Sequence, residues 1–175
     1  MDLKEFGALY VKEGVDFNKI QDGGHQEKDK RAGTENVAGI VGLGKAIEIA
    51  YKDIDKYNNK LVMLRDYYIE QVEKNIPDAK LNGDRFNRLP GNANFSFKGL
   101  DGEELLFKLD EKGICASGGS ACSSGGGKPS HVLLAIGLER ELANSALRIT
   151  LGDENTKEDI DYLISALMEI KKIKS

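Results

Sequence analysis

The sequence has few of the residues that cross-link small proteins or bind metals. Its 175 residues include two cysteines, Cys115 and Cys122, and two histidines, His25 and His131. Two cysteines are too few for a disulfide framework, and their spacing is not the C-x-x-C of redox or zinc sites. The histidines have no partner at metal-ligand spacing. We therefore expect neither disulfides nor a metal site.

Long apolar runs and basic blocks are also missing. No run approaches the roughly 18 apolar residues that cross a bilayer, and the start MDLKE has no apolar segment behind it. The 25 Lys+Arg and 29 Asp+Glu residues give a net charge of −4, which argues against nucleic acid or a membrane surface as the main partner. With 40% hydrophobic residues the chain should fold, and we expect it to be cytoplasmic.

The first third of the chain changes character at Thr34. Residues 7–12 are β-prone and end at a turn, which predicts an edge strand. Either the chain begins in mid-fold or the sheet partner of this strand comes from elsewhere. Residues 16–33 are polar and aperiodic, so they read as a long loop. From Thr34, a plausible N-cap, apolar residues recur every three or four positions until Pro77. This pattern predicts one long helix or two nearly continuous ones.

Short elements follow Pro77. Strands separated by helices, with no repeat, predict an α+β domain with one small sheet covered by helices. We expect a short element at 79–83, one with alternating apolar and polar residues at 92–99, and strands at 113–117 and 146–152. We expect helices at 102–112, 131–138 and from Thr156 onward. The last helix opens with Thr156 and an acid three residues later, which is typical of a capping box.

The segment 117–130, SGGSACSSGGGKPS, is the most informative part of the chain. Glycines and serines cannot form a core, so Cys122 should be exposed and able to move, as a thiolate nucleophile must be. The alternative is a flexible linker with an incidental cysteine. Cys115 lies in the predicted strand GICAS, and we expect it to be a buried, small apolar residue.

Two further positions are candidate anion sites. Arg148 lies between Leu147 and Ile149 on a predicted strand and should point from the polar face toward an anion, because arginine grips a carboxylate with two parallel hydrogen bonds. The alternative is a surface charge. Thr34 and the preceding RAG begin the long helix, where free N–H groups favour a phosphate. Simple N-capping explains the same residues, so both interpretations remain open.

Taken together, these segments resemble the C-terminal portion of pyridoxal-phosphate-dependent cysteine desulfurases of the NifS/IscS type, in the class-V aminotransferase family. The resemblance covers essentially the whole chain in family order. It is carried by FGALYVKEGV, GGHQEKDKRAGTENVAGIVGLGKAIE, LPGNANFSF, GGSACSSGGGKPSHVLLAIGL and ALRITLG.

The resemblance implies a fold and a domain plan. The chain would hold the small C-terminal domain of an aspartate aminotransferase-like, fold type I enzyme, preceded by a long bridging helix. Residues 1–33 would be a remnant of the large cofactor domain, with an edge strand and a loop. Residues 34–76 would form the bridging helix. Residues 77–175 would form the small α+β domain with the cysteine loop at 117–130.

The resemblance also implies roles for four residues. Cys122 matches the catalytic nucleophile that takes sulfur from L-cysteine, releases L-alanine and becomes a persulfide, which a sulfur-acceptor scaffold protein of iron–sulfur cluster assembly then receives. Arg148 matches the residue that grips the substrate carboxylate, and Asn94 lies in a family motif assigned to substrate binding. Thr34 matches the threonine that reaches the cofactor phosphate of the neighbouring subunit in a homodimer.

Some family features are different or absent. His25 stands where a glycine is usual, and Gly119 where a serine is common. The lysine that holds pyridoxal 5′-phosphate covalently belongs to the missing large domain, upstream of this Met1, so the isolated chain is expected to be inactive. Alternatives are a stand-alone persulfide sulfur carrier and a non-catalytic interaction domain.

Overall fold

A computed structural model describes residues 7–118 and 129–174 of the chain. The chain divides into two units, Met1–Ile54 and Asp55–Ser175. Within the described ranges, none of the helices combines the length and the apolar character that a bilayer crossing requires.

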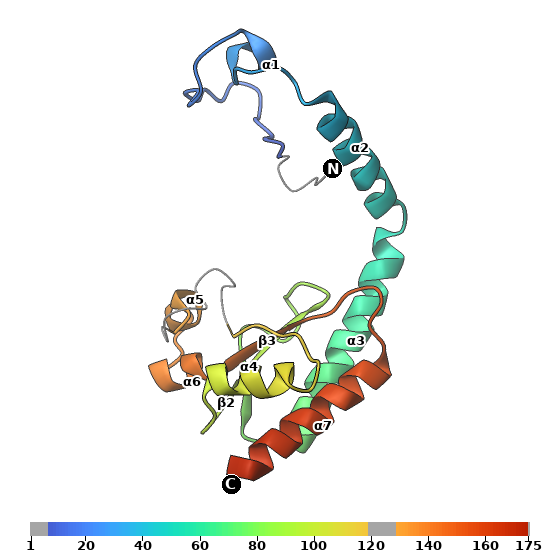
Figure 1. Cartoon of the computed structure of the whole chain (residues 1–175), viewed down its shortest axis with the longest axis vertical. Coiled ribbons are helices and arrows are strands. Elements are labelled where there is room, and N and C mark those ends of the chain that lie inside the picture. Colours follow the sequence, from blue (N-terminus) through green and yellow to red (C-terminus); the bar gives the residue numbers. More distant parts are fainter. Residues whose placement is uncertain (1–6, 119–128, 175) are drawn as a thin grey trace. The chain divides into compact units, whose positions relative to one another are not determined.

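A small antiparallel sheet organises the second unit (Figure 1). Its strands are β1 (Ala79–Leu81), β2 (Asn92–Phe97) and β3 (Ala146–Thr150), and β2 is the central strand. β3 lies in a predicted strand, β2 lies in the segment with alternating apolar and polar residues, and β1 lies in the predicted short element 79–83. The predicted α+β class, with a small sheet covered by helices, is confirmed.

One face of the sheet is apolar and belongs to the main core. Ala93, Phe95 and Phe97 alternate along β2 on this face, and Leu147 of β3 lies directly opposite Phe95. These side chains form one cluster with residues of three helices. The helices are α3 (Ile54–Asn75), α4 (Gly102–Asp110) and α7 (Lys157–Lys174). Burial of each Phe or Leu contributes about 1.5–3 kcal/mol, so this face anchors the sheet on its helices.

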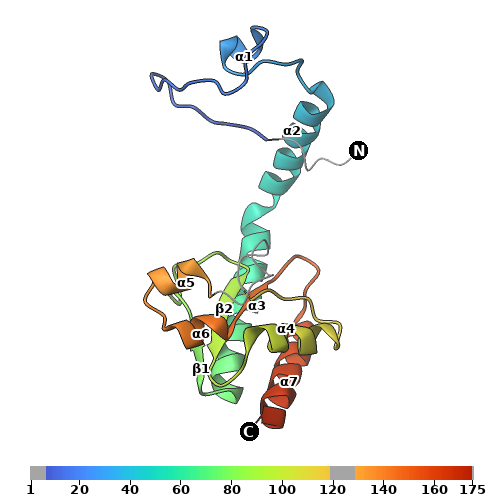
Figure 2. The same cartoon turned by 60° about the vertical axis from the view of Figure 1, so that its left-hand side comes forward.

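The opposite face of the sheet is polar. It carries Asn94 and Ser96 of β2 and Arg148 of β3, because alternate residues of a strand share a face. Two short helices, α5 (His131–Ala135) and α6 (Arg140–Asn144), approach this face through a second hydrophobic cluster that includes Ala146. Figure 2 shows both helices on the side of the sheet away from α3 and α7. They bury Ser96 completely but leave Asn94 and Arg148 half-buried.

Side-chain caps begin the helices that cover the sheet. The carboxylate of Asp101 accepts the N–H groups of Glu103 and Glu104 at 3.0 Å each, where α4 begins. At α7, the Thr156 hydroxyl accepts the N–H of Asp159 at 3.3 Å and the Asp159 carboxylate accepts the N–H of Thr156 at 3.0 Å. The predicted capping box at α7 is therefore confirmed.

The long apolar period after Thr34 forms two helices, as one of the two predicted alternatives stated. They are α2 (Val37–Lys52) and α3, with Asp53 between them. The N-cap predicted at Thr34 is wrong. The side chain of Asn36 caps α2 by accepting the N–H of Gly39 at 3.0 Å, because an asparagine directly before the first helical turn reaches that group.

Residues 7–12 have no regular secondary structure in this chain, so the edge strand predicted there, with a partner from elsewhere, stays a prediction. A strand requires a partner for its N–H and C=O groups, and none pairs with this segment in the part of the chain that the structure describes. Residues 16–33 are irregular, as predicted, apart from the short turn α1 (Gln26–Asp29). Within α1, Glu27, Lys28 and Asp29 have left-handed φ angles of 52°, 57° and 65°, a conformation that costs about 1–2 kcal/mol per residue.

Candidate functional site

Arg148 and Asn94, predicted separately as ligand-binding residues, are neighbours on the polar face. They are register partners in the β2–β3 ladder, which places their Cβ atoms about 4.5–5.5 Å apart on one face of the sheet. Among the described residues, no side chain or carbonyl bonds the Arg148 guanidinium or the Asn94 amide nitrogen. A half-buried arginine with unused donors is the arrangement that an anion would complete.

Asn82, which the sequence analysis did not single out, supports Asn94 from the other side. Its backbone N–H donates to the Asn94 carbonyl at 2.8 Å and extends the pairing of β1 with β2 by one residue. Its side-chain Nδ2 donates to Asn94 Oδ1 at 2.6 Å and to Ser96 Oγ at 2.9 Å. The pairing spans 12 positions of sequence, so no local pattern could have indicated it.

The turn after Asn82 is closed by side chains of its own residues. One carboxylate oxygen of Asp84 accepts the N–H groups of Phe86 at 2.8 Å and Asn87 at 2.6 Å. Arg88 donates from Nε to the Asp84 carbonyl at 2.7 Å and from Nη2 to the Asn82 carbonyl at 3.0 Å. The backbone of Asn82 is therefore held on both its N–H and its C=O.

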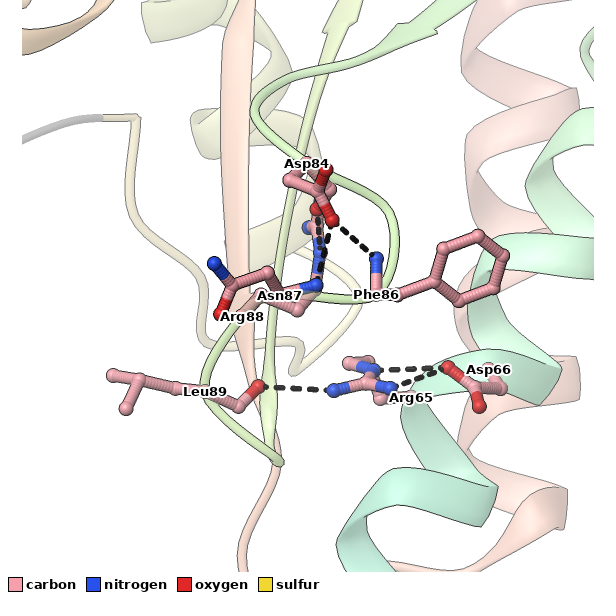
Figure 3. Close-up of polar contacts among 7 residues, drawn as sticks. All are labelled: Arg65, Asp66, Asp84, Phe86, Asn87, Arg88 and Leu89. Atoms are coloured by element: carbon pink, nitrogen blue, oxygen red, sulfur yellow. Dashed lines mark hydrogen bonds and ion pairs between the residues drawn. The ribbon is translucent and has the colours of Figure 1, made fainter.

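A buried arginine of α3 holds the end of the same turn (Figure 3). Arg65 is 4% exposed; it donates to the Leu89 carbonyl at 3.3 Å and forms an ion pair with Asp66 at 2.8 Å. Burial, together with the nearby Arg65 charge, lowers the pKa of Arg88. These contacts set where the chain enters β2, two residues before Asn94.

The segment that leads to the cysteine loop runs beside Arg148. Ser117 forms an isolated antiparallel bridge with Arg148, with N···O distances of 2.6 Å and 3.2 Å. Arg148 thus has Asn94 opposite it on one side and Ser117 on the other. Cys122 lies outside the described residues, as does most of the predicted loop 117–130.

Two predictions for residues 113–117 are wrong. The segment forms no strand beyond the single bridge, because Ser117 is the one residue of 113–117 that pairs with β3. Cys115 is exposed, whereas it was expected to be buried. Its neighbours Ile114 and Ala116 pack against the main core, so the side chain between them faces the other way.

Thr34 lies in the other unit, Met1–Ile54, just before α2. Its side chain is exposed, and no described residue bonds its hydroxyl. The preceding loop is held by Gln26, whose side-chain oxygen accepts the N–H of Gly33 at 3.1 Å. Because Asn36 is the cap, capping no longer explains Thr34.

Comparison with known proteins identifies the family of this chain. The class-V aminotransferase profile matches residues 6–163. The chain belongs to the class-V aminotransferase family. The cysteine desulfurase IscS of Dictyoglomus turgidum is 53% identical over 167 residues, which are 95% of this chain and 42% of that protein. The cysteine desulfurase IscS of Clostridium botulinum strain Hall is 54% identical over 171 residues, covering 97% and 43%.

A solved structure of a NifS-like protein superposes with a TM-score of 0.80 at 31% identity, over 94% of this chain and 41% of that one. The chain therefore spans less than half the length of the curated relatives it matches.

Membership of the class-V aminotransferase family implies the use of pyridoxal 5′-phosphate. Three residues that the sequence predicts as cofactor or substrate ligands carry hydrogen-bond donors. The Thr34 hydroxyl is uncommitted among the described residues, and so are the Arg148 guanidinium and the Asn94 amide nitrogen. Such donors fit phosphate and carboxylate oxygens, which only accept.

Proposed function

We propose that this chain is the C-terminal part of a pyridoxal-phosphate-dependent cysteine desulfurase. The enzyme would convert L-cysteine to L-alanine and pass the sulfur, as a persulfide on Cys122, to an acceptor protein of iron–sulfur cluster assembly. Relatives that bear the name cysteine desulfurase and are 53–54% identical to this chain support the reaction.

The observation that carries the proposal is the half-buried pair of Arg148 and Asn94. Both present free N–H donors on the polar face of the sheet, within the described part of the chain. A substrate carboxylate would accept two parallel hydrogen bonds from the guanidinium and be oriented by it. In this role Arg148 and Asn94 bind the substrate carboxylate and orient the amino acid for the reaction.

The thiol of Cys122 would do the sulfur chemistry. It follows Ser117 by five residues, so the two Cα atoms are at most about 18 Å apart. Its thiolate attacks the sulfur of the bound cysteine; an S–S bond forms, the substrate Cβ–S bond breaks, and a proton replaces sulfur on Cβ. Cysteine and a thiol thus give alanine and a persulfide, with no external oxidant. Bound pyridoxal phosphate would supply the electron sink for this step.

The remaining assignments concern the assembly. Thr34 would donate its hydroxyl to the cofactor phosphate of the neighbouring subunit in a homodimer. Residues 1–33 would belong to the large cofactor domain, 34–76 to the bridge and 77–175 to the small domain. The lysine that attaches the cofactor would lie in the part of the large domain that this sequence does not contain. We place the enzyme in the cytoplasm.

A chimera tests the proposal. The corresponding C-terminal part of the Dictyoglomus turgidum relative is replaced by this chain, and alanine release from L-cysteine is measured. We expect activity that Cys122→Ser abolishes. Arg148→Ala should raise the KM for cysteine roughly 10- to 150-fold, because a charged hydrogen bond contributes about 1.5–3 kcal/mol.

The matched control is Arg140→Ala, which removes an exposed arginine of α6. Its KM should equal that of the parent chimera. An Arg148→Ala chimera with the parent KM, or a Cys122→Ser chimera that releases alanine at the parental rate, would contradict the proposed roles.

A further inference from the structure

We infer that Asn82 is a positioning residue that decides which end of the Asn94 carboxamide faces the ligand. This inference rests on the proposed carboxylate site at Arg148. Asn82 is 5% exposed, and both hydrogens of its side-chain amide are used, by Asn94 Oδ1 at 2.6 Å and Ser96 Oγ at 2.9 Å.

The orientation of the Asn82 amide follows from its surroundings. In the observed orientation one buried acceptor, Asn82 Oδ1, has no donor among the described residues. In the reversed orientation the Asn82 carbonyl oxygen would take the place of Nδ2, and the two hydrogen bonds that Nδ2 donates, to Asn94 Oδ1 and Ser96 Oγ, would both be lost. The observed orientation keeps both of these hydrogen bonds, and each satisfies a polar group in a buried or half-buried place. The observed orientation is therefore the favoured one.

This orientation commits Asn94 Oδ1 to Asn82 and leaves Asn94 Nδ2 uncommitted. The two atoms diverge from one carbon, so Nδ2 is directed away from Asn82. Because β2 is the central strand, Arg148 lies on the flank of Asn94 opposite β1, from which Asn82 follows. The Asn94 amide donor therefore lies on the side of the Arg148 guanidinium. Asn94 and Arg148 together present only N–H donors to a ligand.

A site of this kind selects for an acceptor with a planar, negatively charged end. A carboxylate can accept from the guanidinium and from the amide at once. With the Asn94 amide reversed, its carbonyl oxygen would face the carboxylate and repel it. Asn82 would therefore act on affinity for the amino acid without touching it.

The first test reads the orientation directly, without activity. The full chain is labelled with ¹⁵N, and solvent exchange of the side-chain amide hydrogens is measured by NMR. We expect protected Asn82 hydrogens, which are bonded and buried, and rapidly exchanging Asn94 hydrogens. Protected Asn94 hydrogens would overturn the inference, because they would show that Nδ2 rather than Oδ1 bonds Asn82.

The second test uses the active chimera and separates KM from kcat. Asn82→Ala should raise the KM for cysteine roughly 3- to 10-fold, the loss of one neutral hydrogen bond, with kcat within about two-fold of the parent. Asn82→Asp should raise the KM further, because a carboxylate cannot donate and would draw the Asn94 amide nitrogen toward itself.

Asn87→Asp provides the matched control, since it introduces the same charge five residues away at an exposed position. Its KM should equal that of the parent. Equal KM values for Asn82→Asp and Asn87→Asp would overturn the inference, and so would a fall in kcat alone. Thermal unfolding of each variant separates loss of fold from loss of affinity. A chimera that does not release alanine contradicts the proposed function, and the NMR exchange then decides the inference by itself.

Discussion

Tyr68 places a phenolic hydroxyl in the main core without a partner. The residue is 0% exposed, and its ring meets Phe95 edge to face at 5.8 Å between centroids and 87° between planes. No described residue bonds its oxygen. Replacement of Tyr68 by Phe removes the hydroxyl and keeps the ring, so it isolates the cost of that one buried group.

The magnitude follows from two opposing effects. A buried polar group without a hydrogen bond costs about 1–3 kcal/mol. At roughly 24 cal/mol per Å³ of void, the space left by one oxygen atom costs about 0.3 kcal/mol. Tyr68→Phe should therefore raise the free energy of unfolding by roughly 0.7–2.7 kcal/mol, and each kcal/mol corresponds to roughly 3 °C in Tm.

The same variant should change the response to alkaline pH. Burial raises the pKa of Tyr68 far above its usual value of 10.0. A folded-state pKa above the unfolded value means that the stabilisation is complete below about pH 10 and is lost as the pH rises further. This one group lowers the free energy of unfolding by up to about 1.4 kcal/mol per pH unit in that window. The Tyr68→Phe variant has no ionisable group at this position, so its stability should fall less steeply at alkaline pH.

Urea unfolding of the full chain, followed by circular dichroism at pH 7 and between pH 9 and 11, measures both effects. The control is Tyr67→Phe on the same helix, because the Tyr67 hydroxyl does have a partner, the carboxylate of Asp161 at 2.6 Å. The control should be no more stable than the parent at pH 7. A Tyr68→Phe chain that is less stable than the parent, or that keeps the full alkaline fall, would refute the reasoning.

Two further predictions concern packing and exposure. Gly102→Ala should destabilise the chain by at least about 2 kcal/mol, because the added Cβ would lie 2.3 Å from the Asn144 carbonyl oxygen, whereas Gly44→Ala, with nothing within 4 Å, should be neutral or stabilising in thermal unfolding. Cys115 is exposed, so a Cys122→Ser chain should still take up one equivalent of an alkylating reagent under native conditions; uptake only after unfolding would contradict the observed exposure.

Local patterns were sufficient where a residue's neighbours in sequence decide its environment. The alternation in Asn92–Phe97 set one face of β2 inward, because successive side chains of a strand point to opposite faces. The capping box at Thr156 formed as predicted, since its two hydrogen bonds join residues three apart. The position of Arg148 on a strand followed from the same kind of pattern.

Local patterns failed where another residue took the predicted place. Thr34 has capping chemistry, yet Asn36 stands closer to the first helical turn and caps it. Cys115 lies between Ile114 and Ala116, which both pack against the main core, and its own side chain is therefore exposed.

The sequence by itself determined the class of the fold and the family. It also singled out four candidate site residues one by one, namely Arg148, Asn94, Thr34 and Cys122. It did so through periodicity and motifs, which are properties of neighbouring residues. Only the tertiary structure decided that Asn94 lies opposite Arg148 and that Asn82 holds Asn94 from the far side. Those contacts join β3 and β1 to the central strand across distant parts of the chain, and strand order and register, which no local pattern encodes, bring them together.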